Sequence, residues 1–207
     1  MKRNSLLLAV ITPLLCLLSS CGTSTQLEPT QIKKMASEGI VVVEDEDAKP
    51  QFTLIGTTAF NNKFETITES GTSFADYMVT RLKAKGYKAT KSESKNHPRV
   101  LLLYATYPYQ QPGMTGVGFH RRSFLGISSP VMAFCNFRGT LLDTQTKSSK
   151  HQPINFGDKG YQFGPTPVKR SVKSWSEFTS SEKYQMKSAL KNHMRSQADL
   201  IISQLGL

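Results

Sequence analysis

Cys21 is the residue whose position most clearly invites chemistry, because its thiol follows an apolar segment. The positively charged Lys2 and Arg3 precede a nearly uncharged run of 14 residues, 5–18. A helix of that length measures about 21 Å, whereas the hydrocarbon core of a bilayer is about 30 Å thick. The run is therefore short for a membrane span, and the basic start, short apolar region and small residues predict a secretory signal peptide.

The residues Leu18-Ser19-Ser20-Cys21 resemble the lipobox of bacterial lipoproteins, in which a Leu and two small residues precede the modified Cys. The resemblance implies that residues 1–20 are removed and that Cys21 carries a diacylglycerol and an N-acyl group. No other cofactor is expected. Gly22 resembles the enterobacterial pattern for sorting to the outer membrane, which implies a lipid-anchored domain facing the periplasm or the cell surface. The alternative is a conventional cut that leaves Cys21 as an ordinary half-cystine.

The other two cysteines call for no chemistry. Cys16 lacks small residues before it and is interpreted as an apolar member of the signal peptide. Cys135 lies in an apolar run, which predicts a buried core thiol. A lipidated Cys21 leaves Cys135 without a disulfide partner in its own chain.

Charge is distributed unevenly along the chain. The formal net charge is +11, although residues 21–50 contain more acidic than basic residues, so the positive charge is concentrated in residues 51–207. A basic exported domain can attract anionic lipid headgroups, an anionic cell-wall polymer or an acidic protein partner. Export argues against nucleic acid. The alternative is a solvated basic surface that has no partner.

Two segments combine aromatic and basic residues, the types that dominate binding hot spots. Partner-binding candidates in the first, residues 107–126, are Tyr107, Tyr109, Phe119, Arg121, Arg122 and Phe124. Candidates in the second, residues 161–175, are Lys169, Arg170 and Trp175. The alternatives are that the first segment adds a strand or covers the core, and that the second leads into the last helix.

The sequence shows no catalytic motif. It has no Gly-x-Ser-x-Gly elbow and no Walker loop, and residues 113–118 are Gly-rich without dinucleotide-binding spacing. The histidines have no Cys or His partner at zinc-finger spacing, so no metal is expected; they are His97, His120, His151 and His193. Asp76 and Asp143 are interpreted as a helix cap and a turn residue. A sequence does not show whether two carboxylates lie close in space, as in a glycosidase, so a cell-wall-directed hydrolase is kept as an alternative.

The elements that must position these residues follow from their periodicity. Residues 21–48 are predicted to be a lipidated flexible tether, with a short strand at 39–43 and a solvated acidic linker at 44–47. Residues 49–207 are predicted to form a single domain. Its strands are expected at 51–60, 87–90, 99–107, 131–142 and 153–156, and its helices at 73–85 and 179–205. This order predicts an α/β two-layer sandwich, a mixed sheet of about five strands with both helices on one face.

The order of elements across residues 50–205 resembles that of exported accessory lipoproteins such as the curli-secretion lipoprotein and the activator of penicillin-binding proteins. The resemblance lies in the helix that ends in Gly86-Tyr87, the long strand at 99–107, and Asp143-Thr144-Gln145-Thr146 after a strand. It implies a non-catalytic module that assembles with a partner, and it carries over no ligand-binding residue. A hydrolase, or a carrier of a small ligand or lipid, is the alternative.

Overall fold

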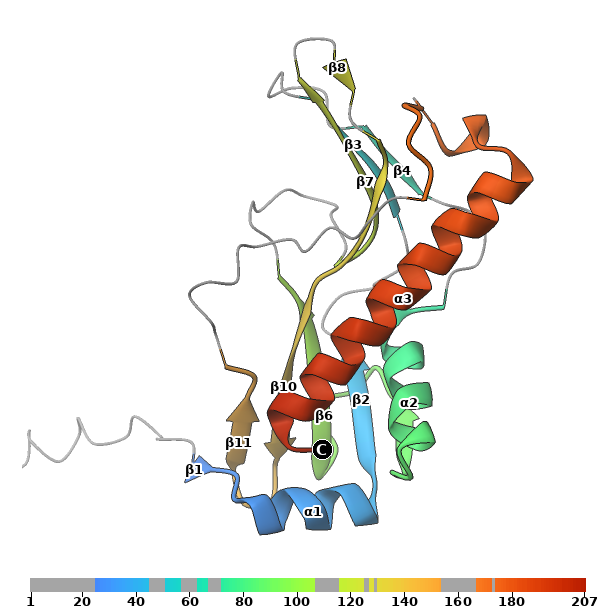
Figure 1. Cartoon of the computed structure of the whole chain (residues 1–207). Coiled ribbons are helices and arrows are strands. Elements are labelled where there is room, and N and C mark those ends of the chain that lie inside the picture. Colours follow the sequence, from blue (N-terminus) through green and yellow to red (C-terminus); the bar gives the residue numbers. More distant parts are fainter. Residues whose placement is uncertain are drawn as a thin grey trace, which may run out of the picture.

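The predicted α/β fold is confirmed, and its main unit is a mixed six-stranded sheet (Figure 1). The computed structural model describes residues 25–44, 51–56, 63–66, 72–106, 116–124, 127–128, 130–153, 167–172 and 174–207. Three α-helices lie within these residues. The long C-terminal helix packs on the sheet, as predicted.

The six-stranded sheet, sheet A, contains in its interior the hydrophobic strand that the sequence predicted at 99–107. Its order is β1 (Thr25–Gln26), β11 (Ser148–His151), β10 (Phe137–Asp143), β6 (Arg99–Ala105), β2 (Ile40–Glu44) and β5 (Ala89–Lys91). β10 is antiparallel to both neighbours, whereas β2 is parallel to β6 and β5. Leu101 and Leu103 on β6 are buried on the helix-covered face, and Leu102 and Tyr104 on the other face are half-buried.

A second sheet was not predicted. Sheet B contains β4 (Lys63–Thr66), β3 (Gln51–Gly56), β7 (Val117–Phe124) and β8 (Ile127–Ser128), and β9 (Met132–Cys135) also pairs with β7. The single strand predicted at 131–142 is in fact β9 and β10. They separate at Asn136, whose N–H donates to the Gly116 carbonyl at 2.6 Å and whose carbonyl accepts from Thr106 at 3.0 Å. The chain thereby passes from sheet B to sheet A.

The helix α2 (Phe74–Ala84) forms where a capped apolar stripe predicted it. The Ser73 side chain accepts a hydrogen bond from the Asp76 N–H, which satisfies one of the free donors of the first turn. At the other end, Tyr87 and Gly86 donate to the carbonyls of Leu82 and Lys83, and Gly86 takes the positive φ of 88° that this ending requires. The stripe that the sequence predicted is buried: Phe74, Tyr77, Met78 and Leu82.

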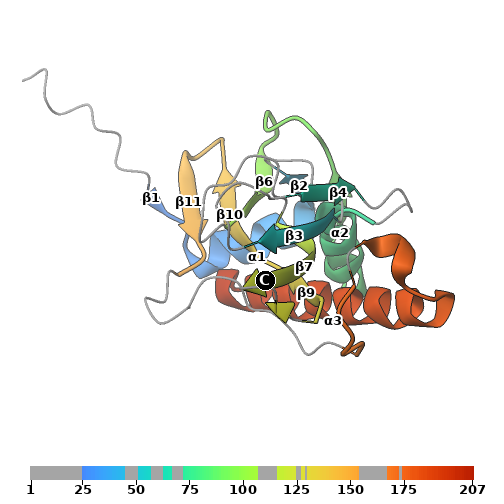
Figure 2. The ribbon, with the colours of Figure 1, turned by 90° about the horizontal axis from the view of Figure 1, so that it is seen from above.

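The helix α3 (Ser180–Leu205) runs along one side of both sheets (Figure 2). Thr179 and Glu182 form the predicted capping box. The predicted apolar stripe is buried, and it consists of Met186, Leu190, Met194, Ala198, Ile201 and Leu205. α3 approaches sheet A closely at Gly139 on β10, where a Cβ atom would lie 2.6 Å from Cγ2 of Ile201.

The predicted flexible tether is wrong for residues 25–38, which form β1 and α1 (Pro29–Glu38), whereas the short strand predicted at 39–43 is confirmed as β2. α1 crosses one end of sheet A (Figure 1). The composition of this segment is mostly polar, but α1 is a short amphipathic helix in which Ile32 and Met35 are buried. Pro29 occupies the first turn of the helix, where a missing N–H costs nothing, and the Gln31 side chain accepts from the Glu28 N–H at 2.8 Å. The folded domain therefore begins near residue 25 instead of residue 49.

The hairpin strand predicted at 153–156 is displaced toward the N-terminus. β11 occupies Ser148–His151 and pairs with both β10 and β1. Its residues are polar, so the strand has no apolar alternation that the sequence could reveal. Residues 154–156 lie outside the described residues.

The close approach of α3 to β10 generates a stability prediction. Gly139→Ala is expected to lower the free energy of unfolding by about 1–3 kcal/mol, because the new methyl group overlaps Ile201 and lies 3.1 Å from Cδ1 of Leu205. Urea denaturation measures the change.

The double variant with Ile201→Ala is the control. It removes the obstructing methyl group, so the double variant is expected to be more stable than the sum of the single effects. Additive effects would show that close approach to Ile201 is not what requires glycine at residue 139.

Candidate binding surface on α3

The polar side of α3 carries a row of four basic residues, which we call the basic row: Lys183, Lys187, Lys191 and Arg195. Residues four apart lie on the same flank of a helix, so the row runs beside the buried row that contains Met186, Leu190 and Met194. Successive cations are separated by about 6 Å along the helix, and the row is about 18 Å long. Lys183 is half-buried and the other three side chains are exposed.

The two carboxylates of α3 are bound by arginines from other elements. Glu182 accepts two hydrogen bonds from Arg170, from Nε and Nη2, both at 2.7 Å. Asp199 accepts from Nη2 of Arg81 on α2, at 2.7 and 2.8 Å for its two oxygens. No acidic residue lies between Glu182 and Asp199 in the sequence. Both side-chain carboxylates of α3 are therefore paired with arginines that lie outside the helix.

Like charges at this spacing work against the helix. Each i, i+4 pair of equal charge costs about 0.2–0.5 kcal/mol, and the basic row contains three such pairs. The burial of a single large apolar side chain offsets that cost, at about 1.5–3 kcal/mol. The buried row therefore stabilises the helix in spite of the repulsion within the basic row.

A groove of about 620 Å³ lies beside the basic row. The described residues that line it are Pro167, Tyr184, Gln185, Ser188, Ala189, Asn192, His193 and Ser196. Apart from Pro167 they belong to the next two rows of α3, and Tyr184 is 74% exposed. Burial lowers the pKa of His193 below its ordinary value of 6.5, so its ring is neutral at pH 7. A groove whose described lining carries no charge at pH 7 thus adjoins a row of basic residues.

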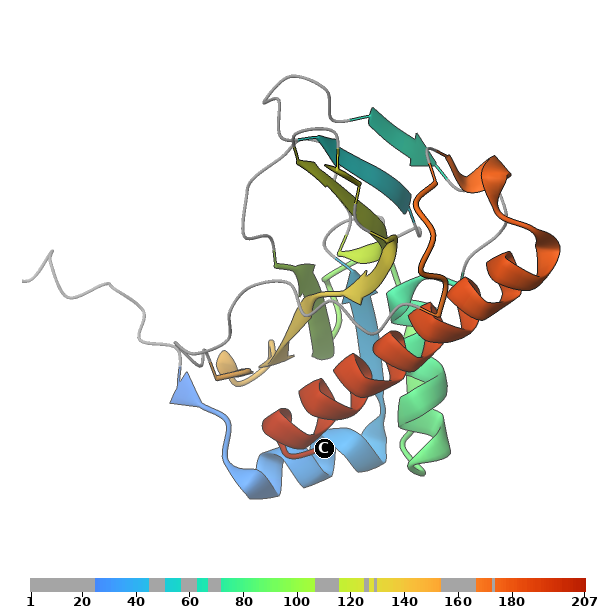
Figure 3. The ribbon, with the colours of Figure 1, turned by 45° about the horizontal axis from the view of Figure 1, so that its top comes forward.

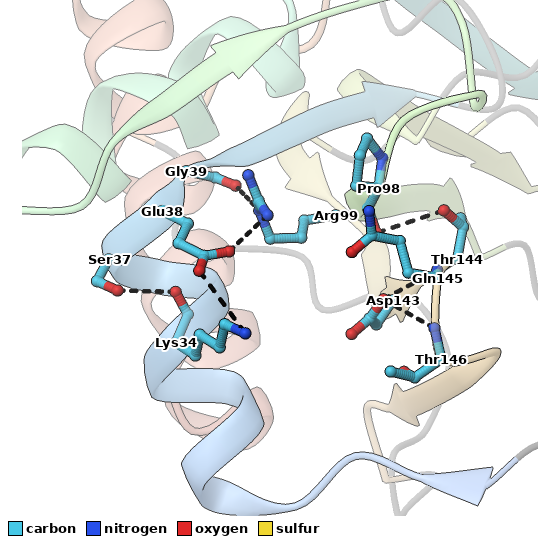
Figure 4. A network of polar contacts seen from close by, with 10 residues as sticks. All are labelled: Lys34, Ser37, Glu38, Gly39, Pro98, Arg99, Asp143, Thr144, Gln145 and Thr146. Carbon is cyan, nitrogen blue, oxygen red and sulfur yellow. Dashed lines mark hydrogen bonds and ion pairs between the residues drawn. The ribbon is translucent and has the colours of Figure 1, made fainter.

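A smaller cleft of about 120 Å³ lies between α1 and the turn at residues 144–147 (Figure 4). Arg99 donates to Glu38 at 2.6 Å and to the Gly39 carbonyl at 2.9 Å. The Asp143 side chain accepts from the backbone of Gln145 and Thr146, which confirms its predicted role in a turn. Arg99 thus joins the end of α1 to sheet A and Asp143 closes a turn, so the contacts in Figure 4 have a structural role.

The N-terminus of α2 holds a serine beside a lysine, a pairing that can activate a nucleophile. The Ser73 hydroxyl lies 2.9 Å from Nζ of Lys91, but it donates to Asp76 at 2.6 Å and serves as the helix cap. Lys91 also forms an ion pair with Asp76, at 3.2 Å. The cluster thus caps and fastens the start of α2.

Glu44 corrects the predicted solvated linker at 44–47. It ends β2, and its carboxylate accepts a hydrogen bond from the Ala75 N–H in the first turn of α2. Burial raises the pKa of Glu44 above its ordinary value of 4.5. Residues 45–47 lie outside the described residues.

Two of the aromatic residues proposed as partner-binding belong to the core. Phe119 and Trp175 are 1% and 6% exposed, and their rings stack with centroids 4.9 Å apart. Phe178 contacts Trp175 edge-on at 5.3 Å. The alternative reading of residues 107–126, an added strand, is the one that holds for β7. An aromatic residue in or beside a Gly- or Pro-rich segment looks the same in a sequence whether it binds a partner or fills a core.

The remaining predicted site residues are scattered. Arg170 is bound to Glu182 and lies over the Phe178 ring at 5.6 Å, whereas Lys169 is exposed. Arg121, Arg122 and Phe124 lie on β7. Cys21, Tyr107 and Tyr109 lie outside the described residues. Cys135 is 2% exposed, which confirms the predicted core thiol, and burial raises the pKa of this thiol.

The basic row was missed by reasoning from the sequence, although its signal was present there. Lysine or arginine recurs at every fourth position from 183 to 195, but only the apolar stripe of the same helix was considered. Searching predicted helices for charges of one sign at i, i+4 spacing would have found it.

Neither a scan against protein-family models nor searches of the curated proteins and of the solved structures finds a match to this chain. Among the described residues, no helix is both long and apolar enough to cross a membrane. The same residues contain no group of three or more His, Cys, Asp or Glu side chains that could hold a metal ion.

The Arg170–Glu182 pair generates a pH-dependence prediction. The hydrogen bonds from Arg170 and Thr179 hold the pKa of Glu182 at about 2, below its ordinary value of 4.5. The folded state therefore favours the ionised carboxylate. The resulting stabilisation is fully present above pH 4.5 and is lost as the pH falls to about 2. Thermal unfolding between pH 2 and pH 6 measures this loss.

Glu182→Gln is expected to lower the melting temperature at pH 6 and to reduce its fall between pH 4.5 and pH 2. Glu93→Gln, which removes an exposed carboxylate between β5 and β6, is the matched control and should leave the fall in place. An unchanged pH profile in Glu182→Gln would contradict the prediction.

Proposed function

We propose that this protein is a lipid-anchored, non-catalytic binding module of the bacterial envelope that holds an anionic envelope component against α3. The observation that carries this proposal is the basic row, four cations about 6 Å apart whose helix has both of its carboxylates bound by Arg170 and Arg81. A strip of one charge raises the local concentration of a polyanion and speeds its association.

The position of β1 supports anchoring of the domain close to a membrane. Only residues 22–24 separate Cys21 from Thr25 of β1, so an extended chain places the two residues at most about 14 Å apart. A lipid on Cys21 would therefore hold the edge of sheet A formed by β1 and β11 near the bilayer.

α3 would then carry its basic row away from that edge. The last turn of α3 lies beside β11, because Gln204 accepts a hydrogen bond from Gln152 at 2.6 Å. Figure 3 shows the opposite end of α3 on the far side of the molecule, toward sheet B. Measured along the helix, the basic row begins about 14 Å from Gln204, at Arg195, and ends about 32 Å from it, at Lys183. That spacing would present the row to a polymer outside the bilayer.

The described polar clusters support a module without catalysis. Ser73 and Asp76 cap a helix, Arg99 and Glu38 fasten α1, and Asp143 closes a turn. Each of these groups already has a structural partner. No observation at the described residues favours the hydrolase alternative.

The basic row generates a binding prediction. Lys191→Glu is expected to weaken the binding of an anionic polysaccharide such as polygalacturonate roughly tenfold, which is about 1.4 kcal/mol. The same change puts a carboxylate four residues from both Lys187 and Arg195, so it replaces two repulsions by two attractions and raises helix stability by about 1 kcal/mol. Biolayer interferometry and urea denaturation measure the two effects.

Lys88→Glu, which makes the same charge change at an exposed position before β5, is the matched control and should leave affinity within about twofold. Equal losses in both variants would mean that net charge alone attracts the polymer. No loss in Lys191→Glu would remove the basic row from the proposal.

The anchor generates a separate prediction. Labelled palmitate is expected to enter the protein in growing cells, and Cys21→Ala is expected to abolish the label and to release the protein from the membrane fraction. Cys135→Ala is the control and should keep the label, because Cys135 is buried. Label that persists in Cys21→Ala would refute the lipid anchor but would leave the proposed role of the basic row unchanged.

A further inference from the structure

The described lining of the groove on α3 contains no charged side chain. Six of its side chains can form hydrogen bonds without carrying charge at pH 7: Tyr184, Gln185, Ser188, Asn192, His193 and Ser196. Pro167 and Ala189 are the apolar members among the described residues. The groove therefore offers donors and acceptors along its length, and the surface between them is more apolar than polar.

This chemistry distinguishes between anionic ligands. An acidic helical peptide binds a groove through apolar anchors at i, i+3 and i+4, which need an apolar groove. Among the described lining residues, Tyr184 is the one large side chain with an apolar face, so the lining lacks the series of anchor sites that such a peptide needs. A glycan instead presents many hydroxyl groups, which suit Ser, Asn and Gln, and ring faces, which suit an exposed aromatic side chain such as Tyr184.

The two rows lie parallel on the same helix, so one linear ligand can contact both. Tyr184, Ser188, Asn192 and Ser196 form the row next to the basic row, each one position after a basic residue. A polymer that follows the groove along α3 would meet a cation about every 6 Å on one flank. Sugar rings in the groove would thus place their acidic groups toward the cations.

We propose that the groove and the basic row together bind a linear acidic glycan, a polysaccharide that carries carboxylate or phosphate groups. Its rings lie along the groove against Tyr184 and Asn192, and its anionic groups pair with Lys191 and Arg195. This inference rests on the proposed function and specifies its ligand.

Three polymers and the full protein, purified from membranes in detergent, test the inference. Polygalacturonate supplies sugars with charge, poly-L-glutamate supplies charge without sugars, and dextran supplies sugars without charge. Polygalacturonate is expected to bind at least about tenfold more tightly than either of the others, a difference of about 1.4 kcal/mol.

Variants in the groove separate sugar contacts from charge. Tyr184→Ala and Asn192→Ala are expected to weaken polygalacturonate binding roughly tenfold while leaving poly-L-glutamate binding unchanged. Both side chains are exposed, so neither change should affect folding. Tyr184→Phe keeps the ring and is the matched control, with an affinity expected to stay close to that of the unaltered protein.

The outcomes distinguish this inference from the proposed function. If poly-L-glutamate binds as tightly as polygalacturonate and the groove variants have no effect, the glycan inference fails while anion binding by the basic row stands. If dextran binds as tightly as polygalacturonate, the part of the inference that concerns acidic groups fails. If none of the three polymers binds, the inference and the proposed function fail together.

Discussion

The burial of one row of α3 against two sheets is the constraint on which the rest of the molecule depends. Met186, Leu190, Met194 and Ala198 recur every fourth residue, and this row turns slowly around the helix while it follows both sheets. Once that row is buried, the direction of every other side chain on the helix is settled. The basic row and the groove take their positions from it. Gly139 is needed for the same reason, because α3 lies so close to β10 that a methyl group at residue 139 would overlap Ile201.

Two arginines then decide the electrostatic character of α3. Arg170 precedes the helix and binds Glu182 in its first turn, whereas Arg81 reaches from α2 to Asp199 near its end. Each is a two-point contact between a guanidinium group and a carboxylate, the strong geometry for such pairs. They fasten the ends of the helix and at the same time pair with its two side-chain carboxylates. An ordinary amphipathic helix thereby becomes a cationic surface.

The stacking of Phe119 on Trp175 shows why aromatic residues were a poor guide to the site. Both residues stand in segments rich in Gly, Pro, Ser or basic residues, which resemble binding loops in a sequence. In the structure the two rings are partners although they lie far apart in the chain, and their burial joins the segment before α3 to sheet B. Arg170, also proposed for binding, is occupied by Glu182 and Phe178. The candidate binding surface that remains is on α3, where the regular spacing of basic residues indicates it.

Local features were determined by the sequence alone, because they depend on residues within one or two turns of each other. These include the cap of α2 at Ser73, the capping box at Thr179, the apolar faces of both helices, the turn at Asp143 and the buried Cys135. Pairings between distant segments were decided by tertiary structure. The parallel pairing of β3 with β7, the docking of β1 and α1 and the choice of Arg81 for Asp199 each join residues far apart in the chain. Periodicity reports which face of an element is buried, but it does not name the element that buries it.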